Sequence, residues 1–426
     1  MEIHSHIDEH LETDLLVVGA GIAGISTALE AAETGFRVIL LEKEPFIGGR
    51  VSQLNQYFPK LCPPSCGLEI NIRRLRDNTN IDLITLCDVA NIEGSPGSFT
   101  VTVNQKARFV NNRCTTCGDC VPVCPVERDN TFNFNIDKTK AIYINHENAY
   151  PQKYVIDPNV CLGESCSECV KACKYEAIDL KQSTKHIQIK TKAIVWATGW
   201  NPYDANKLEY LGFGKYPEVI TNMMFERYSA PNGPTKGKII VPGKNKEIDK
   251  IAFVQCAGSR DELHLEYCSS ICCLASMKQA QYVREQYPNA EIHIFYIDLR
   301  AQGLLEDFYS KTKKDEKTFF HRGKVAKVFK DDTDGQIIVE AENTLEGKLH
   351  QKKFDLVVLA TGMKPSNKMN GNIIKEFLDD SGFVKTDENY KIIGCGVSTG
   401  PKEVASVVQE STGAALKAIH YMKGGK

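Results

Sequence analysis

The sequence predicts an α/β protein in which two Rossmann-like nucleotide-binding domains share the chain with an inserted ferredoxin-like module. Three observations carry this prediction. A glycine-rich turn joins an apolar strand to a helix near the N-terminus, two later apolar strands each end in Ala-Thr-Gly, and eight cysteines in two spaced runs lie between residues 114 and 173. The first two patterns are typical of βαβ units, and the third is typical of metal-cluster loops.

The composition limits the classes of protein to consider. With 426 residues, 42% apolar and 25% charged, and a mean hydropathy of −0.29, the chain can form two or three domains. The net charge of −2 shows no basic cluster, so we expect no nucleic-acid binding. No apolar signal segment and no run of 18 apolar residues occur, which predicts a cytoplasmic protein without a membrane span of its own. Sixteen cysteines in that compartment indicate metal or redox chemistry.

The first βαβ unit starts at Asp14 and contains the glycine turn. This turn reads Gly19-Ala-Gly21-Ile-Ala-Gly24, and a helix and a second strand ending in Glu42 follow it. Gly19 would make the turn, Gly21 would let the backbone approach a pyrophosphate, and Gly24 would let the helix pack on the sheet. The pyrophosphate would lie at the helix N-terminus and Glu42 would bind a ribose hydroxyl. A tight turn without a ligand is the alternative.

Several short motifs favour FAD at this site. Residues 48–50 read Gly-Gly-Arg, residues 197–199 and 360–362 read Ala-Thr-Gly, and a loop at 394–400 precedes a C-terminal amphipathic helix. These segments resemble the FAD motifs of two-dinucleotide-binding-domain flavoproteins of the thioredoxin reductase type, in which the chain crosses between domains at each Ala-Thr-Gly. The usual Gly-Asp of the last loop is absent, so the ribityl contact stays unassigned. The cofactor-binding residues implied are Gly19, Gly21, Gly24, Glu42, Lys43, Gly49, Arg50, Ala197, Thr198, Gly199, Thr361 and Gly362.

A second βαβ unit lies between the two Ala-Thr-Gly motifs. Strand KIAFVQCAGSRD (250–261) is followed by a helix around 275–286 and by the strand EIHIFYID. Its loop holds Cys256-Ala-Gly-Ser where an NAD(P)H site would need GxGxxG. We therefore expect no ordinary nicotinamide site, and an NAD(P)H-dependent flavoenzyme is the first alternative.

The two cysteine runs predict two 4Fe–4S clusters. The runs are C-x2-C-x2-C-x3-C-P from Cys114 and C-x4-C-x2-C-x3-C from Cys161. In bacterial ferredoxins the first three thiolates of such a run bind one cluster and the fourth binds the other. Zinc, the alternative, prefers two separated C-x2-C pairs. The expected ligands are Cys114, Cys117, Cys120 and Cys173 for the first cluster, and Cys161, Cys166, Cys169 and Cys124 for the second. The x4 gap and Lys174 depart from the usual second run.

Residues 267–273, YCSSICC, add three thiols to the second βαβ unit. We expect them at the start of the helix, with Cys268 and Cys272 four residues apart on one face. Cys256 would end the preceding strand, so that four thiols would meet where a pyrophosphate would otherwise bind. Cys256, Cys268, Cys272 and Cys273 would hold a third cluster or, alternatively, be small buried apolar side chains.

These motifs together resemble the A subunits of heterodisulfide reductases. The phrases GGRVSQLNQYFPKLCPPSCGLEIN, ATGWNPYD, QCAGSRD and YCSSICC resemble more closely the A subunits of quinone-interacting membrane-bound oxidoreductase complexes. The resemblance implies that the third thiol group binds a 4Fe–4S cluster. It also implies electron transfer between membrane quinones and cytoplasmic adenylylsulfate reductase in dissimilatory sulfur metabolism. The partners would be a membrane haem subunit together with a related iron–sulfur flavoprotein subunit, on the cytoplasmic face of the inner membrane. A soluble heterodisulfide reductase is a further alternative.

The motifs divide the chain into five segments. FAD-binding segments are expected at 1–105, 183–245 and 355–426, the ferredoxin-like module at 106–182, and the second Rossmann-like domain at 246–354. No acid–base or nucleophilic residue is required, because FAD would exchange electron pairs and the clusters would carry single electrons. A scaffold that uses its clusters only for structure is a third alternative. Cys62 and Cys66 are expected to be structural or a flavin-facing pair, and Cys87 and Cys395 to be buried thiols.

Overall fold

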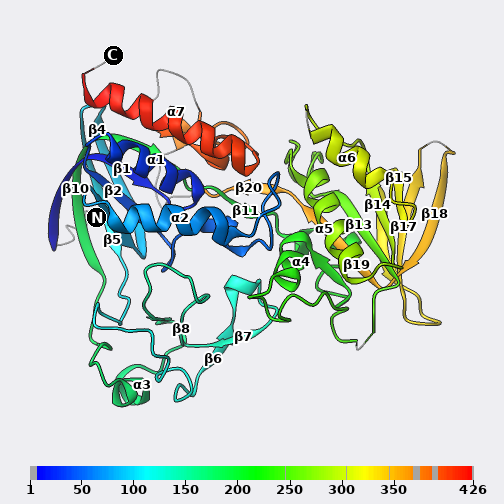
Figure 1. Cartoon of the computed structure of the whole chain (residues 1–426), viewed down its shortest axis with the longest axis horizontal. Coiled ribbons are helices and arrows are strands. Elements are labelled where there is room, and N and C mark those ends of the chain that lie inside the picture. Colours follow the sequence, from blue (N-terminus) through cyan, green and yellow to red (C-terminus); the bar gives the residue numbers. More distant parts are fainter. Residues whose placement is uncertain are drawn as a thin grey trace.

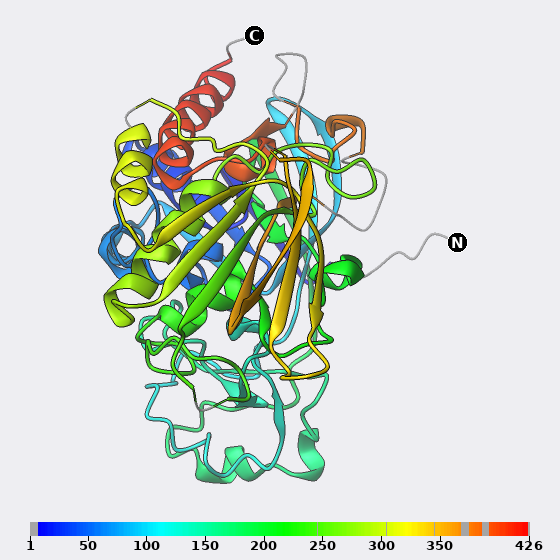
Figure 2. The same ribbon diagram turned by 90° about the vertical axis from the view of Figure 1, so that its right-hand side faces the viewer.

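The computed structural model describes residues 7–244, 246–303, 305–344, 346–367, 375–385 and 392–424. Two sheets flanked by helices lie at opposite ends of the long axis, and a module with little regular structure lies below them (Figure 1). The view from the side shows the same module at the bottom, separate from both sheets (Figure 2). The fold is therefore α/β with an insertion, as the sequence predicts.

The first sheet carries the glycine turn. Its strand order is β3-β2-β1-β10-β5-β4, with β21 beside β10. β1 runs parallel to β2 and β10, whereas β5 is antiparallel to β10 and β4. The strands are β1 (Glu9–Val18), β2 (Val38–Glu42), β3 (Ile81–Thr85), β4 (Cys87–Ser95), β5 (Ser98–Gln105), β10 (Lys185–Trp196) and β21 (Ile393–Gly394).

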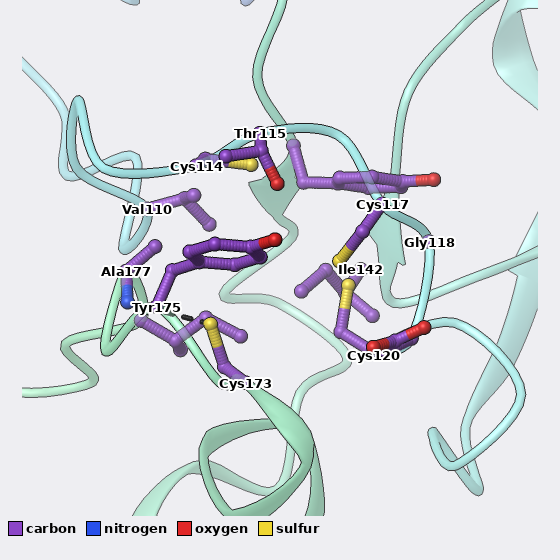
Figure 3. A pocket seen from close by; sticks show the side chains of 13 residues that line it. Val110, Cys114, Thr115, Cys117, Gly118, Cys120, Ile142, Cys173, Tyr175 and Ala177 are labelled. Carbon is purple, nitrogen blue, oxygen red and sulfur yellow. Dashed lines mark hydrogen bonds between the residues drawn. The ribbon is translucent and has the colours of Figure 1, made fainter.

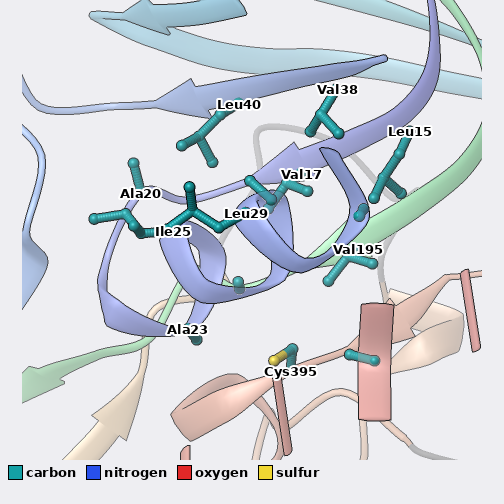
Figure 4. Packing of buried hydrophobic residues seen from close by; sticks show 14 of the residues in the cluster. Leu15, Val17, Ala20, Ala23, Ile25, Leu29, Val38, Leu40, Val195 and Cys395 are labelled. Atoms are coloured by element: carbon teal, nitrogen blue, oxygen red, sulfur yellow. The ribbon is translucent and has the colours of Figure 1, made fainter. Parts of the chain in front are cut away.

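Both faces of the first sheet are covered, which explains the continuous apolar run in β1. Leu15 and Val17 pack with the helices on one face, while Leu16 and Val18 join a second apolar cluster on the other. Figure 4 shows the first of these clusters, in which Leu29 of α1 lies against the sheet. The helices of this domain are α1 (Ile22–Glu33), α2 (Pro64–Asp77) and α7 (Val404–Met422).

The second sheet is parallel, with strand order β12-β19-β13-β14-β15. A three-stranded antiparallel sheet, β16-β17-β18, packs beside it. The strands are β12 (Val219–Thr221), β13 (Lys250–Ala257), β14 (Glu291–Tyr296), β15 (Thr318–Arg322), β16 (Val325–Lys330), β17 (Ile337–Asn343), β18 (Lys348–Phe354) and β19 (Leu356–Thr361). The helices are α4 (Asn222–Ser229), α5 (Cys272–Gln286) and α6 (Leu305–Lys313).

The chain crosses between the two sheets directly after each Ala-Thr-Gly motif. The crossing segments β11 (Trp200–Pro202) and β20 (Met363–Pro365) pair antiparallel. This corrects two expected limits. β12 and α4 belong to the second domain rather than to an FAD-binding segment reaching residue 245, and β19 is a central strand of the second sheet rather than the start of a segment at 355. The motifs themselves, and not the residues around them, mark the crossings.

The ferredoxin-like module is inserted between β5 and β10. Its regular elements are short, and apolar side chains gather around its cysteines. Cys124 lies between a turn at 121–123 and β6, outside any helix. The elements are β6 (Glu127–Asp129), β7 (Lys138–Lys140), β8 (Ile142–Tyr143), β9 (Val155–Ile156) and α3 (Glu168–Ala172).

Candidate flavin and iron–sulfur sites

The glycine turn has the geometry that a dinucleotide needs. Gly19 has φ +103°, and a Cβ there would lie 2.5 Å from the carbonyl oxygen of Ala197. A Cβ on Gly24 would lie 1.8 Å from the carbonyl oxygen of Gly19. At Gly21 the nearest atom to such a Cβ is the Cα of Gly49, at 3.9 Å. The first and third glycines are therefore required by packing, while the second leaves room for a ligand at the N-terminus of α1.

Glu42 closes the far side of this turn. Its carboxylate accepts hydrogen bonds from the backbone N–H groups of Ala20 (2.7 Å) and Glu44 (2.9 Å). Burial raises the pKa of Glu42 to about 7, although these two hydrogen bonds oppose the rise. Two donors hold the carboxylate in place, and a ribose hydroxyl is a fitting additional donor. Lys43 instead points toward Asp88 (Nζ–Oδ1 3.8 Å) with a largely exposed side chain.

Arg50 joins the Gly-Gly-Arg turn to the first crossing segment. Its Nε donates to the carbonyl oxygen of Trp200 (3.2 Å) and its Nη1 donates to Gln53 (2.9 Å). A further contact joins Nη2 to Asn201. The predicted residues Gly49, Arg50 and Gly199 are thus brought to one region, where β11 begins.

Asn367 is a residue that the sequence analysis missed. It is buried, and its Oδ1 accepts hydrogen bonds from Thr198 Oγ1 (2.7 Å) and Trp196 Nε1 (3.2 Å). Its Nδ2 donates to the carbonyl oxygens of Gly382 (2.8 Å) and Ser398 (3.1 Å). Asn367 follows β20 outside any motif, so no spacing could have identified it. It fixes the first Ala-Thr-Gly segment to the C-terminal loop.

The second Ala-Thr-Gly has a different environment from the first. Thr361 Oγ1 donates to Asn222 Oδ1 (2.9 Å), and its carbonyl oxygen lies 4.0 Å from the Cys272 thiol. A Cβ on Gly362 would lie 2.2 Å from Ser259 Oγ. These two predicted FAD residues therefore make their contacts inside the second domain, beside the third thiol group.

The C-terminal loop replaces the missing Gly-Asp with other contacts. Gly396 N–H donates to Glu410 of α7 (2.8 Å), and Glu410 also pairs with Lys402 (3.0 Å). Cys395 is fully buried, within 3.6 Å of Thr27 Oγ1 and 3.5 Å of Ser411 Oγ. Figure 4 shows it among the apolar side chains near α1. Burial of Cys395, and of Cys87, was predicted and is confirmed.

Four thiols from both cysteine runs line one cavity. Figure 3 shows Cys117 and Cys120 on one side and Cys173 on another, with the Tyr175 ring between the chain segments. Burial raises the pKa of Cys120 to about 12, and the nearby Cys114 and Cys117 thiolates add to the rise. The thiols that line this cavity are Cys114, Cys117, Cys120 and Cys173.

A second cavity is lined by the remaining four thiols of the two runs. Burial raises the pKa of Cys169 to about 11, with Cys161 and Cys124 contributing. The backbone N–H of Gly163 donates to Cys161 Sγ (3.4 Å), a hydrogen bond of the kind that tunes cluster potentials. The lining thiols are Cys124, Cys161, Cys166 and Cys169. Both sets of four match the crosswise grouping, and their apolar walls and donor sulfurs fit 4Fe–4S clusters.

The third thiol group gathers between β13 and α5. Helix α5 begins at Cys272, so Cys268 lies in the preceding loop and the expected position on a shared helical face is wrong. The loop nevertheless returns Cys268 to the others: the Cys272 pKa is raised well above its usual value by burial first, and by Cys273, Cys256 and Cys268 in turn. Four sulfurs next to one helix N-terminus fit an anionic cluster.

Across the residues that the structure describes, no three His, Cys, Asp or Glu side chains lie close enough together to hold a single metal ion. A 4Fe–4S cluster instead takes one thiolate for each of its irons, so its ligands surround a cavity. In the described part of the chain, no helix is both long and apolar enough to cross a membrane.

The comparisons with known proteins agree with the glycine-turn geometry and with the sheet order. A family described as FAD dependent oxidoreductase matches residues 14–77. Thioredoxin reductase of Lactococcus lactis, in its FR conformation, superimposes with a TM-score of 0.53 at 15% identity, covering 97% of this chain and 99% of its own. Thioredoxin reductase of T. acidophilum gives 0.52 at 14% identity, with the same coverage. The predicted fold class is confirmed.

The chain is also similar in sequence to curated proteins. The A subunit of the ferredoxin/F(420)H(2)-dependent CoB-CoM heterodisulfide reductase of Methanosarcina acetivorans is 38% identical over 430 residues, which cover 97% of this chain and 54% of the relative. The iron-sulfur A subunit of the CoB–CoM heterodisulfide reductase of Methanocaldococcus jannaschii is 37% identical over 95% of this chain and 64% of its own length. The chain is homologous to the A subunits of heterodisulfide reductases. It spans 54% to 64% of the length of these two relatives.

A buried ion pair between α4 and α5 was not predicted from the sequence either. Lys278 Nζ lies 2.9 Å from Glu226 Oε1, and the two side chains are 3% and 2% exposed. Lys278 also donates to the carbonyl oxygen of Gln56 (2.5 Å), and the N–H of Asn55 donates to Glu226 (3.0 Å). Single lysines and glutamates carry no spacing signal, so only the fold reveals the pair. It joins α4 and α5 to the loop that follows the Gly-Gly-Arg turn.

Cys62 and Cys66 lie at the N-terminal end of α2, away from the three thiol groups in sequence. Cys66 is exposed and Cys62 is partly exposed, and both lie near the Tyr57 hydroxyl. Burial raises the pKa of Tyr57, and the two thiolates add to this rise. Their role, structural or facing the flavin, stays a prediction.

Proposed function

We propose that this chain is the electron-transfer subunit of a heterodisulfide reductase-like complex, carrying FAD and three 4Fe–4S clusters. The observation that supports it most is the sorting of the eight ferredoxin-type cysteines into two cavities, each lined by three thiols of one run and the fourth thiol of the other. FAD supplies two-electron chemistry when bound, and clusters supply single-electron steps.

The protein's own residues would hold these groups. Gly21 leaves room for the pyrophosphate and Glu42 accepts a ribose hydroxyl, while Arg50 orders the turn beside them. The proposed cluster ligands are the first cavity's four thiols, the second cavity's four thiols, and Cys256, Cys268, Cys272 and Cys273. The apolar side chains packed around the ferredoxin-type thiols and the N–H donor to Cys161 would tune the potentials of the clusters.

The proposed physiological link is between membrane quinones and cytoplasmic adenylylsulfate reductase. It rests on the resemblance of GGRVSQLNQYFPK, QCAGSRD and YCSSICC to quinone-interacting complexes. The partners would be a membrane haem subunit together with a related iron–sulfur flavoprotein subunit, with this chain peripheral on the cytoplasmic face. The relatives' names support the other candidate, a component of a soluble heterodisulfide reductase. Affinity purification from the native membrane separates the two, since recovery with a haem protein supports only the first.

Anaerobic quantitation of iron, acid-labile sulfide and flavin tests the cofactor content. We expect about twelve irons per FAD in the wild type, and about eight in Cys272→Ser, because one 4Fe–4S cluster is lost. Cys395→Ser is the matched control, since its thiol is buried between Thr27 and Ser411 and belongs to none of the three groups. About eight irons in the wild type would contradict a third cluster.

Rapid bleaching of the flavin by NADH or NADPH would instead favour the nicotinamide-dependent alternative. Clusters that cannot be reduced and reoxidised without unfolding the protein would favour the scaffold alternative.

A further inference from the structure

The loop between β13 and α5 is closed to a dinucleotide. Its one glycine, Gly258, has φ +80°, and a Cβ there would lie 2.6 Å from the Tyr203 ring. Tyr203 is held in place by a hydrogen bond of its hydroxyl to His264 Nδ1 (2.8 Å). A pyrophosphate needs an uncovered glycine backbone at this position of a Rossmann unit. An aromatic ring covers it here instead.

The acidic residue of this unit is also occupied. In a dinucleotide-binding βαβ unit, an acid after the second strand binds the ribose. Asp298 follows β14 in that position, but its carboxylate pairs with the Arg260 guanidinium and lies 3.5 Å from Arg300 Nε. We call these three residues the Arg260–Asp298–Arg300 group.

The Arg260–Asp298–Arg300 group lies beside the third thiol group. The Arg260 side chain contacts the Cys256 thiol, and the backbone N–H of Arg300 contacts the Cys273 thiol. Cys273 Sγ in turn lies 3.8 Å from the carbonyl oxygen of Asp298. Two guanidinium groups and one carboxylate leave a net positive charge next to the sulfurs.

We propose that the Arg260–Asp298–Arg300 group has replaced ribose recognition and raises the reduction potential of the third 4Fe–4S cluster, with Arg260 as the positioning residue. This inference rests on the proposed function, since it needs a cluster on the four thiols. Reduction adds one electron and neither forms nor breaks a bond, so the cluster with its thiolates becomes more negative. Nearby positive charge favours that reduced form, and the N-terminus of α5 acts in the same direction.

Potentiometric titration followed by electron paramagnetic resonance tests the proposal on the full chain. In Arg260→Gln we expect the midpoint potential of the third cluster to shift to a more negative value, and in Arg260→Lys to stay close to that of the wild type. Arg284→Gln is the matched control, because Arg284 is ion-paired with Asp315 (2.9 Å) near the far end of α5. The two ferredoxin-type clusters should keep their potentials in all three variants.

Asp298→Asn should change the potential of the third cluster in the opposite direction. It therefore still tests the proposal if Arg260→Gln fails to bind the cluster. Removal of the carboxylate leaves both guanidinium groups uncompensated, so the third potential should shift to a more positive value. Unchanged potentials in Arg260→Gln and Asp298→Asn, with about twelve irons per FAD retained, would overturn the inference while leaving the proposed function intact. About eight irons in the wild type would instead remove the third cluster and both proposals for it.

Calorimetry with NADH and NADPH examines the replaced nucleotide site directly. We expect no heat of binding to the wild type. Binding that Asp298→Asn weakens would show that the acid still recognises a ribose, and would overturn the replacement.

Discussion

Gly24 and Gly413 both lie inside helices, but they differ in how closely other atoms approach them. A Cβ on Gly24 would lie 1.8 Å from the carbonyl oxygen of Gly19, which is backbone and cannot move aside cheaply. A Cβ on Gly413 would meet nothing within 4 Å. Packing of the turn therefore requires glycine at position 24. No such packing requires glycine at position 413.

Gly24→Ala should accordingly destabilise the protein by about 1–3 kcal/mol and reduce the FAD retained per chain, because α1 would move away from the turn. Gly413→Ala should stabilise it by up to about 1 kcal/mol, since alanine is the better helix former. Thermal unfolding and flavin absorbance measure both effects. Equal melting temperatures for the two variants would contradict the packing argument.

The sequence identified single residues well where a motif fixes their spacing and poorly where only the fold does. Gly19 and Gly24 lie in the close-packed turn that the fingerprint predicts. The binding of a ribose by Glu42 stays a prediction. Cys268 was predicted to lie on the helix because a spacing of four residues suggests a shared helical face. It lies instead in the loop before α5, which begins at Cys272. Asn367 has no motif, because its partners come from segments far apart in the chain.

At the scale of elements, α4 and α5 enclose a charge pair that water does not reach. Lys278 and Glu226 are almost fully buried and also bond the backbone of the loop at 55–56. Removal of one partner would leave the other charge buried and uncompensated, which is far more costly than loss of an exposed pair. The sequence predicted both βαβ units. It could not predict the contact of this ion pair in the second unit with the loop at 55–56 in the flavin half.

Lys278→Met should therefore lower the free energy of unfolding by roughly 3–5 kcal/mol. The double variant Lys278→Met/Glu226→Gln should recover part of that loss, because no unpaired charge remains. Lys250→Met is the control, since Lys250 forms a largely exposed pair with Glu291 (2.8 Å) and should cost less than about 1 kcal/mol. Urea unfolding measures all three. A double variant no more stable than Lys278→Met would argue against charge burial as the cause.

At the scale of the whole molecule, Arg227 of α4 ties three parts of the chain together. Its fully buried side chain donates to Asn133 in the ferredoxin-like module (2.8 Å), to the carbonyl oxygen of Gln53 (3.3 Å) and to Asn232 (2.9 Å). The guanidinium also stacks over the Phe132 ring, 4.8 Å from its centre. Arg227 is thus one of the side chains that hold the inserted module, the loop after the Gly-Gly-Arg turn and the second domain together.

Arg227→Met should increase hydrogen–deuterium exchange in three separate segments, 49–56, 130–137 and 222–232, because each loses a partner. Each buried acceptor left without a donor costs about 1–3 kcal/mol. Arg74→Met is the control, because Arg74 pairs with Glu33 at an exposed position and should change exchange only locally. Increased exchange limited to α4 would contradict the role as a link.

The parallel pairing of β10 with both β1 and β21 has a consequence for biosynthesis. A ribosome releases the ferredoxin-like module and the second sheet while β10 still lacks its neighbour β21 and α1 still lacks α7. Because α7 packs against the same apolar cluster as α1, that surface stays uncovered until α7 emerges. The flavin half therefore closes only after the module and the second sheet have been translated, and we expect a nascent chain to bind iron at its ferredoxin-type thiols before it can retain a flavin.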